Sequence, residues 1–230
     1  MEPPAPPSPG PTRPLHIAVT LLVAAAGSVE TISFLGLDHV FAGVMTSNLA
    51  LLGMAIGQQQ ALNVTAAALA LAGFGIGAAV AAWFTRRSGI PAARWQPRVM
   101  SCLVATTVIL VVIAAVWAAV DGAPRGITRS LLQFAAAVAM GVESTAMVAA
   151  GHAAAPTTYL TGTLATYIVK GVGAVRQEHW IPVRFGALIV GAAISAVLLK
   201  AAPAWAAVPP VVLMLCALLA ARGRWPLRWR

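Results

Sequence analysis

Charged residues are scarce in this sequence, and acidic ones are scarcer than basic ones. Of 230 residues only 9% are charged, with 6 Asp+Glu against 15 Lys+Arg. A soluble domain carries about 25% charged residues, so this chain has too few to cover a surface that faces water. Hydrophobic types make up 60% of it, and its mean hydropathy is +0.85. These values exclude an ordinary soluble enzyme and predict an integral membrane protein with several spans of about 20 apolar residues each.

The motifs of metal, phosphate and nucleophile chemistry are also missing. The two cysteines, Cys102 and Cys216, lie inside apolar runs and have neither metal-ligand spacing nor a disulfide framework. The sequence contains no glycine-rich phosphate loop with lysine and no nucleophile motif. We therefore expect no enzymatic activity, no cofactor and no metal. Basic residues fall in short clusters between apolar runs, as in cytoplasmic loops of membrane proteins, so no nucleic-acid partner is expected.

Eight apolar runs are present, and two of them differ from the others. The runs cover residues 15–37, 40–57, 61–85, 99–120, 127–150, 157–173, 183–201 and 205–221. Those at 40–57 and 157–173 carry Thr, Ser, Asn and Gly where a plain span would have Leu. Such segments reach membrane depth only where protein or a water-filled cavity satisfies their backbone. The predicted fold is an all-α integral membrane protein with about six transmembrane helices and two short interrupted or re-entrant helices.

The chain resembles itself at an offset of about 114 residues. The Val-Glu pair ending at Glu30 lies 113 positions before the pair ending at Glu143, and the segments 45–49 and 160–164 are 115 apart. The alanine-rich segments 77–82 and 191–196 are 114 apart. Ordered matches at nearly one offset indicate an internal duplication. The expected organisation is a disordered proline-rich tail at 1–14, membrane repeats at 15–120 and 121–222, and a basic tail at 223–230.

The placement of basic residues distinguishes six spans from eight. Six spans put twelve basic residues on the side of the N-terminus, including Arg13 and the 86–98 cluster, and three on the other side. With eight spans, the 86–98 cluster falls on the side opposite Arg13. The positive-inside rule therefore favours six spans, with both termini in the cytoplasm. Three spans in each repeat would give the two repeats opposite orientations. The expected location is the plasma membrane of a bacterium. The tryptophans lie mostly near run ends, where interface anchoring explains them.

Two segments resemble the signatures of a known family. Residues 27–53, GSVETISFLGLDHVFAGVMTSNLALLG, and the pair MGVEST and TTYLTGTL at 140–145 and 157–164 resemble the two signatures of the YoaK family of bacterial membrane proteins. The resemblance extends from about His16 to Ala220 and implies a six-span inner-membrane protein of unknown function. Glu30 stands where the family commonly has Asp, Ser47 replaces a glycine, and Glu143-Ser144 replaces Gln-Asn. That last change adds an acid that the family lacks.

The candidate site consists of polar residues inside apolar runs. A charged side chain at the bilayer centre costs about 2.5–3.5 kcal/mol on insertion scales, so Glu30 and Glu143 are expected to face the bundle interior, as proton- or cation-binding groups or as hydrogen-bonded links between helices. Hydroxyls and amides beside an interrupted helix bind small polar solutes or cap their own helix. The candidate substrate- or ion-binding residues are Glu30, Thr46, Ser47, Asn48, Glu143, Tyr159, Thr161 and Thr163. A gate or proton relay is assigned to Asp38, His39 and His152, with interfacial turns as the simpler explanation.

Three functions fit these residues. The leading hypothesis is a secondary transporter for a small solute, coupled to protons or ions through the intramembrane glutamates. The second is a non-transporting assembly factor, sensor or structural protein whose polar residues join helices. The third is a membrane enzyme acting on lipid, for which no catalytic pair is visible. The expected partners are the lipid bilayer and a small solute or ion, and faces rich in small residues permit either a monomer or a homodimer.

Overall fold

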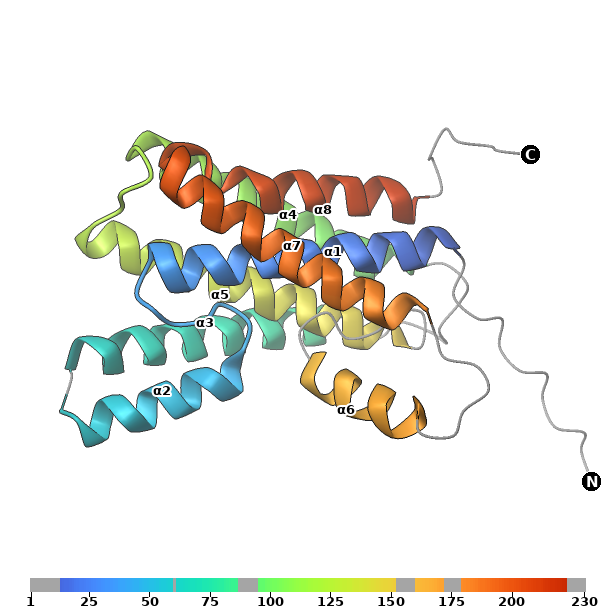
Figure 1. The fold of residues 1–230 in the computed structure, drawn as a ribbon, viewed down its shortest axis with the longest axis horizontal. Coiled ribbons are helices and arrows are strands. Elements are labelled where there is room, and N and C mark those ends of the chain that lie inside the picture. The colour runs from blue at the N-terminus through green and yellow to red at the C-terminus, as the bar shows by residue number, and fades with distance from the viewer. Residues whose placement is uncertain (1–12, 60, 87–94, 152–159, 172–178, 223–230) are drawn as a thin grey trace, which may run out of the picture.

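A computed structural model of the chain describes residues 13–59, 61–86, 95–151, 160–171 and 179–222. All regular elements in this part of the chain are helices (Figure 1). Six segments are long and apolar enough to cross a membrane. They are formed by α1 (Arg13–Thr31) with the π-helical turn η1 (Ile32–Gly36), α3 (Ala61–Thr85), α4 (Pro97–Ala119), α5 (Gly126–Ala149), α7 (Trp180–Ala201), and α8 (Val208–Ala221) with the short turn η3 (Pro203–Trp205). The predicted all-α membrane fold is confirmed.

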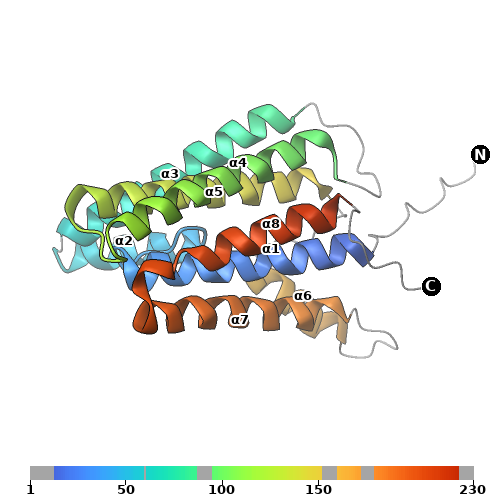
Figure 2. The ribbon, with the colours of Figure 1, turned by 90° about the horizontal axis from the view of Figure 1, so that it is seen from above.

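Two shorter helices, α2 (Met45–Gly57) and α6 (Leu160–Gly171), lie beside the long ones. At 1.5 Å per residue, the 13 residues of α2 span about 20 Å, which is less than the hydrocarbon core of about 30 Å. Helix α1 ends and α3 begins at the same end of the bundle, and α5 ends and α7 begins together at the other end (Figures 1 and 2). Among the described residues, the helices long enough to cross a membrane therefore number six, and neither short helix adds to them.

Local sequence explains where the spans begin and end, as α4 illustrates. Pro97 occupies the start of α4, where its missing N–H costs no hydrogen bond. The chain leaves α4 through Asp121 and Gly122, whose φ angles are 53° and 72°. A side chain on Gly122 would collide with the backbone of Pro203. This turn therefore requires glycine both for its conformation and for space against η3.

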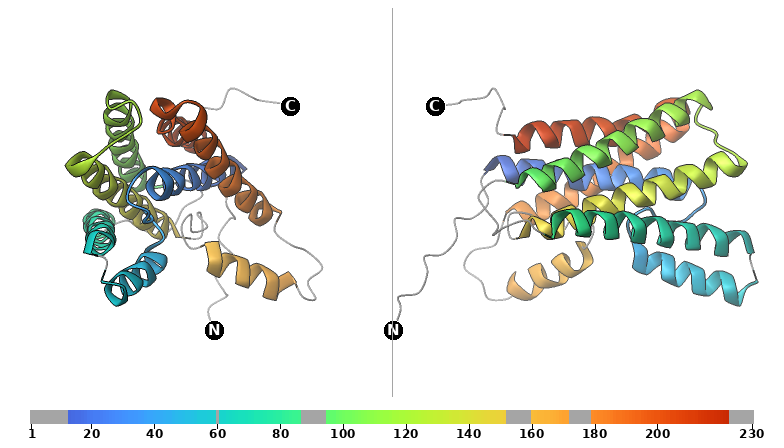
Figure 3. Two further views of the ribbon diagram at one scale, coloured as in Figure 1. Left: turned by 60° about the vertical axis from the view of Figure 1, so that its left-hand side comes forward. Right: turned by 180° about the vertical axis from the view of Figure 1, so that it is seen from behind.

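The six spans form two groups of three. Helix α1 packs against α7 and α8, while α5 packs against α3 and α4, and contacts between α4 and α8 join the groups (Figure 3). Glycines allow the closest approaches within each group. A Cβ on Gly77 would collide with the Val138 carbonyl of α5, and one on Gly191 would collide with the Ala24 carbonyl of α1. Small residues serve this purpose in membranes, where lipid tails give helices little hydrophobic drive to associate.

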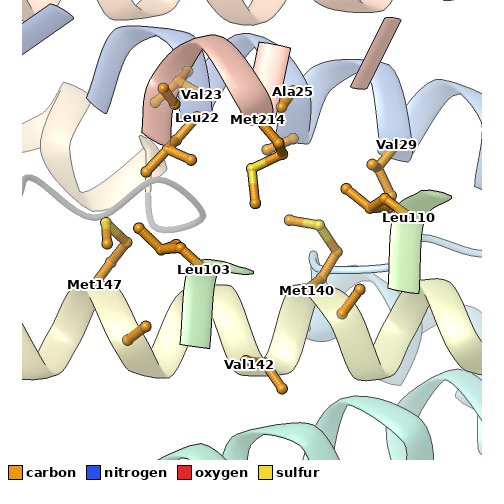
Figure 4. Packing of buried hydrophobic residues seen from close by; sticks show 14 of the residues in the cluster. Leu22, Val23, Ala25, Val29, Leu103, Leu110, Met140, Val142, Met147 and Met214 are labelled. Carbon is orange, nitrogen blue, oxygen red and sulfur yellow. The ribbon is translucent and has the colours of Figure 1, made fainter. Parts of the chain in front are cut away.

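A core of large side chains fills the space between the groups. Met140 and Met147 of α5 point toward Leu22 of α1 and Met214 of α8 (Figure 4), and all four are no more than 2% exposed. Trp117 corrects one expectation from the sequence, because it is fully buried and not an interface anchor. Its indole N–H donates to the Pro203 carbonyl at 2.8 Å, so η3 covers the end of α4.

Candidate functional site

The carboxylate of Glu30 binds the backbone of the segment that follows α1. Its Oε2 accepts the Ala42 N–H at 2.9 Å, and its Oε1 accepts the Gly43 N–H at 2.8 Å. Glu30 is half-buried one residue before the end of α1, and the π-helical turn η1 begins at Ile32. The chain then folds back, so that residues 41–43 pass beside the helix they have just left.

Asn48 holds the same segment from its other side. Its Oδ1 accepts the Phe41 N–H at 2.9 Å, and its Nδ2 donates to the Phe41 carbonyl at 2.6 Å. An amide side chain presents both a donor and an acceptor, which matches both polar groups of one backbone residue. Asn48 is fully buried in the first turn of α2. Together Glu30 and Asn48 bind three consecutive residues, and we name residues 41–43 the clamped loop.

The clamped loop lies deep in the bundle. A Cβ on Gly43 would lie 2.7 Å from Glu30 Oε1 and 3.3 Å from the Cβ of Met140, a residue near the middle of α5. Only glycine lets the carboxylate approach the backbone this closely. Irregular backbone at this depth needs protein partners for its polar groups, and Glu30 and Asn48 supply them.

A second set of polar contacts fixes the residues just before the clamped loop. Ser33 Oγ lies 2.6 Å from the Val40 carbonyl and 2.8 Å from Gln133 Oε1. A hydroxyl has one hydrogen to donate, so one of these contacts requires Gln133 to donate with its amide turned over. The Gln133 Nε2 has no hydrogen-bond partner among the described residues, and the turned amide would give it one. This buried network ties η1, the loop and α5 together.

Asp38 forms an ion pair with Arg129 at the start of α5, with Nε and Oδ1 2.5 Å apart. The Asp38 side chain is 15% exposed and that of Arg129 is 41% exposed. Sequence reasoning assigned Asp38 to a gate but missed Arg129, Ser33 and Gln133. Gln133 carried a readable signal, an amide inside an apolar run, whereas the side-chain partners of Ser33 and Arg129 lie about a hundred positions away in the sequence.

The remaining predicted residues of the first half surround this site. His39 is exposed, has a φ of 56°, and lies edge-on to Phe34 with the ring centroids 5.9 Å apart. Thr46 is exposed and Ser47 half-buried in the first turn of α2. In the described residues, the hydrogen bonds that hold the clamped loop come from Glu30 and Asn48 and not from these two hydroxyls.

The second half of the candidate site is only partly described. Glu143 lies in α5 with 1% of its surface exposed, beside the buried Ser144. Thr161 and Thr163 belong to the backbone of α6. Tyr159 and His152 lie outside the described residues. The structure thus brings Glu30 and Asn48 together around the clamped loop and places Glu143 in the buried part of α5.

The geometry defines what Glu30 can do chemically. Each carboxylate oxygen has two lone pairs, and the loop amides use one on each oxygen. The carboxylate is thus able to accept a further hydrogen bond from a solute, contact a cation, or bind a proton. A proton on the free lone pair of Oε2 would leave the bond to the Ala42 N–H in place but weaken it, because the oxygen of a neutral carboxyl group is a poorer acceptor than that of a carboxylate.

Comparisons with known proteins agree with the resemblance seen in the sequence. The family model described as "Protein of unknown function (DUF1275)" matches residues 18–220. The UPF0700 transmembrane protein YoaK of Bacillus subtilis (strain 168) is 33% identical over 150 residues, which cover 65% of this chain and 64% of that protein. The match therefore spans a little less than two thirds of the relative. No solved structure matches the chain.

Proposed function

We propose that this chain, a multi-pass membrane protein that belongs to the DUF1275 family of proteins of unknown function, is a secondary transporter for a small polar solute. The observation that carries the proposal is the bidentate contact of Glu30 with the Ala42 and Gly43 amides. An ionisable side chain inside a membrane usually marks an ion or proton pathway. Here that side chain holds a re-entrant loop, so a change in its charge acts directly on irregular backbone within the bundle.

Proton binding to Glu30 is the coupling step in this proposal. A proton taken up from the aqueous side binds the free lone pair of one carboxylate oxygen, and both amide bonds weaken because the acceptor is no longer charged. The clamped loop then separates from α1 at that point and opens a path past it. Deprotonation on the other side restores both bonds and closes the path. We assign the hydroxyls of Thr46, Ser47, Thr161 and Thr163 to solute binding, and Glu143 to the second coupling group.

Paired glycine contacts support an internal repeat behind this mechanism, and three spans in each half would make the two halves inverted. Gly27 meets the Leu188 carbonyl, and Gly141 meets the Phe74 carbonyl. Gly141 lies 114 positions after Gly27, and Leu188 lies 114 after Phe74. Exchanging the two halves of the chain therefore turns one contact into the other. Inverted repeats in transporters place binding sites near the midplane, and rocking of one unit against the other alternates access.

The contacts of Gly77 and Gly191 repeat this relation with the same offset. Gly77 meets the Val138 carbonyl and Gly191 meets the Ala24 carbonyl. Gly191 is 114 positions after Gly77, and Val138 is 114 after Ala24. Two independent pairs of contacts with one offset argue for duplication more strongly than alanine-rich sequence does.

The ends of the helices support the proposed orientation. Among the described basic residues, one end of the bundle carries Arg13, Arg86, Arg98, Arg184 and Arg222, and the other carries Arg125, Arg129 and Lys200. Basic residues accumulate on the cytoplasmic side. We therefore assign the end with Arg13 and Arg222 to the cytoplasm of a bacterial cell, with the protein in the plasma membrane.

The test is solute-driven proton movement in proteoliposomes that contain a trapped pH dye. A panel of small polar solutes is screened, and wild type is expected to change the internal pH with at least one of them. Glu30→Gln keeps the size of the side chain but removes the titrating group, and is expected to reduce that proton movement at least ten-fold. Asp121→Asn is the matched control, because Asp121 is exposed in the α4–α5 turn and asparagine tolerates its positive φ. Proton movement at the wild-type rate in folded Glu30→Gln would contradict the coupling role.

A second candidate is a non-transporting assembly, sensor or structural protein. The same geometry favours it, because both oxygens of Glu30 already bind backbone amides. In that case the clamp only stabilises the fold, no solute moves in the liposome assay, and the loop stays closed at every pH at which the protein is folded.

A further inference from the structure

An open groove runs along the outer face of the bundle between α4 and α8. Its volume is about 550 Å³, within the range of about 300–1,000 Å³ that ligand sites occupy. Seven of its nine lining residues are valines or leucines, and the other two are Thr107 and Arg222. The groove is separate from the clamped loop, whose residues contact α1, α2 and α5.

The walls of the groove are short, apolar and largely exposed side chains. The face of α4 along it carries valines, which are short and stiff about χ1. Val108 and Val112 each remain 57% exposed, and Leu215 on α8 remains 47% exposed. The Thr107 hydroxyl donates to its own helix at the Leu103 carbonyl, at 2.8 Å. The groove wall is thus apolar along its length, and Val104 to Val112 extend for about 12 Å.

Arg222 gives the groove a charged end. It follows the last residue of α8, is exposed, and is the only charged residue among those lining the groove. Within the described residues, no hydrogen bond or ion pair of its side chain is present. Because it directly follows a helix that is apolar enough to span a membrane, its guanidinium is expected at the depth of lipid headgroups. Figures 2 and 3 show the start of α4, which carries Arg98, at this same end.

We propose that the α4–α8 groove binds one anionic phospholipid from the leaflet on the Arg222 side. An acyl chain lies along the valines of α4, and the guanidinium of Arg222 binds the headgroup phosphate through two parallel hydrogen bonds. Arg98 in the first turn of α4 adds positive charge beside the groove, which favours a headgroup with net negative charge over a zwitterionic one. This inference stands on the groove alone and is independent of transport.

The first experiment measures lipid binding by native mass spectrometry of the purified full chain. Phosphatidylglycerol and phosphatidylcholine with identical acyl chains are compared. Wild type is expected to retain one phosphatidylglycerol in preference, and Arg222→Gln to lose about ten-fold in affinity for it, as expected for a lost charge-assisted pair. Arg86→Gln, at the end of α3 on the same side but outside the groove, is expected to behave as wild type. Equal losses in the two variants would show that only net charge matters and would overturn the site.

Two further variants distinguish the contribution of the lipid headgroup to binding from that of the acyl chain. Arg222→Lys keeps the charge at the end of α8 but lacks the planar fork, so binding is expected to fall between wild type and Arg222→Gln. Val108→Phe fills the groove and is expected to reduce binding of both lipids. Val190→Phe is its control, because Val190 is 56% exposed on α7, away from the groove. Unchanged lipid binding in Val108→Phe would overturn the proposal. Conversion of a dimer to a monomer by this substitution would also overturn it, because a second copy of the chain would then be what covers the groove.

Discussion

At the scale of single residues, the clamped loop depends on three matched chemical groups. Glu30 offers two oxygens to two successive amides, Asn48 offers a donor and an acceptor to Phe41, and Gly43 offers the space for the carboxylate to approach. Substitutions at these positions remove different contacts of the clamped loop. Gln at position 30 keeps one acceptor and presents an NH₂ group to an N–H, while a side chain at position 43 displaces the carboxylate.

Hydrogen exchange of the clamped loop tests this arrangement without a known solute. In Glu30→Gln, exchange of the amides at 41–43 is expected to rise about ten-fold or more, because a buried hydrogen bond to a charged group is lost. Mass spectrometry of deuterated peptides that cover residues 37–44 measures it. In wild type the same amides are expected to exchange faster, after correction for the intrinsic effect of pH, as Glu30 becomes protonated, whereas Glu30→Gln is expected to show no such dependence.

The dependence of this hydrogen exchange on pH distinguishes the two proposed functions. Asp121→Asn serves as control and is expected to follow wild type throughout. A loop whose corrected exchange is independent of pH in wild type, while the protein remains folded, would argue against a protonation-controlled gate and for a purely structural clamp.

At the scale of helices, the glycines of α3 and α7 fall into two kinds, those that pack against a neighbouring helix and those that face open space. Gly77 and Gly191 face carbonyl groups of neighbouring helices, whereas Gly75 and Gly186, on the same two helices, have no atom within 4 Å of an added Cβ. The chain thus contains a matched control inside each helix. Alanine at an open position gains helix propensity, and alanine at a packed one pushes two helices apart.

We expect Gly77→Ala and Gly191→Ala to destabilise the protein by about 1–3 kcal/mol each through overpacking. Gly75→Ala and Gly186→Ala are expected to be neutral or to stabilise it by up to about 1 kcal/mol. Thermal or denaturant unfolding in one detergent measures all four. The proposed repeat adds a stricter requirement, that the two packed positions respond by similar amounts. A large difference between Gly77 and Gly191 would contradict equivalent places in two repeats.

Sequence patterns identify helices more readily than the contacts between them. The long apolar runs gave the six spans because a span needs length and hydropathy, both of which are local properties. Glu30 and Asn48 were identifiable as polar residues in apolar segments. Their partners were not, because backbone amides carry no sequence signal. The burial of Trp117 was missed for a related reason, since η3, which covers it, is 86 positions away.

At the scale of the whole molecule, the short helix α2 decides the topology. Because α2 returns to the end at which α1 finished, positions before and after it lie at defined ends of the bundle (Figure 1). Arg13 and Arg86 stand at one end of the bundle, and Gln58 stands at the other. A crossing α2 would instead put Arg13 and Gln58 on one side and Arg86 on the opposite side.

Cysteine accessibility measures this arrangement directly. Single cysteines at positions 13, 58 and 86, in a background where Cys102 and Cys216 are replaced by serine, are labelled in intact cells with a membrane-impermeant maleimide. Gln58→Cys is expected to react from outside, because Gln58 is exposed at the end of α2, and Arg13→Cys and Arg86→Cys only after the cells are opened. Reaction of Arg86→Cys in intact cells with Gln58→Cys protected would mean that α2 crosses. The clamped loop would then lie between two full spans, and the orientation drawn from the basic residues would fail with it.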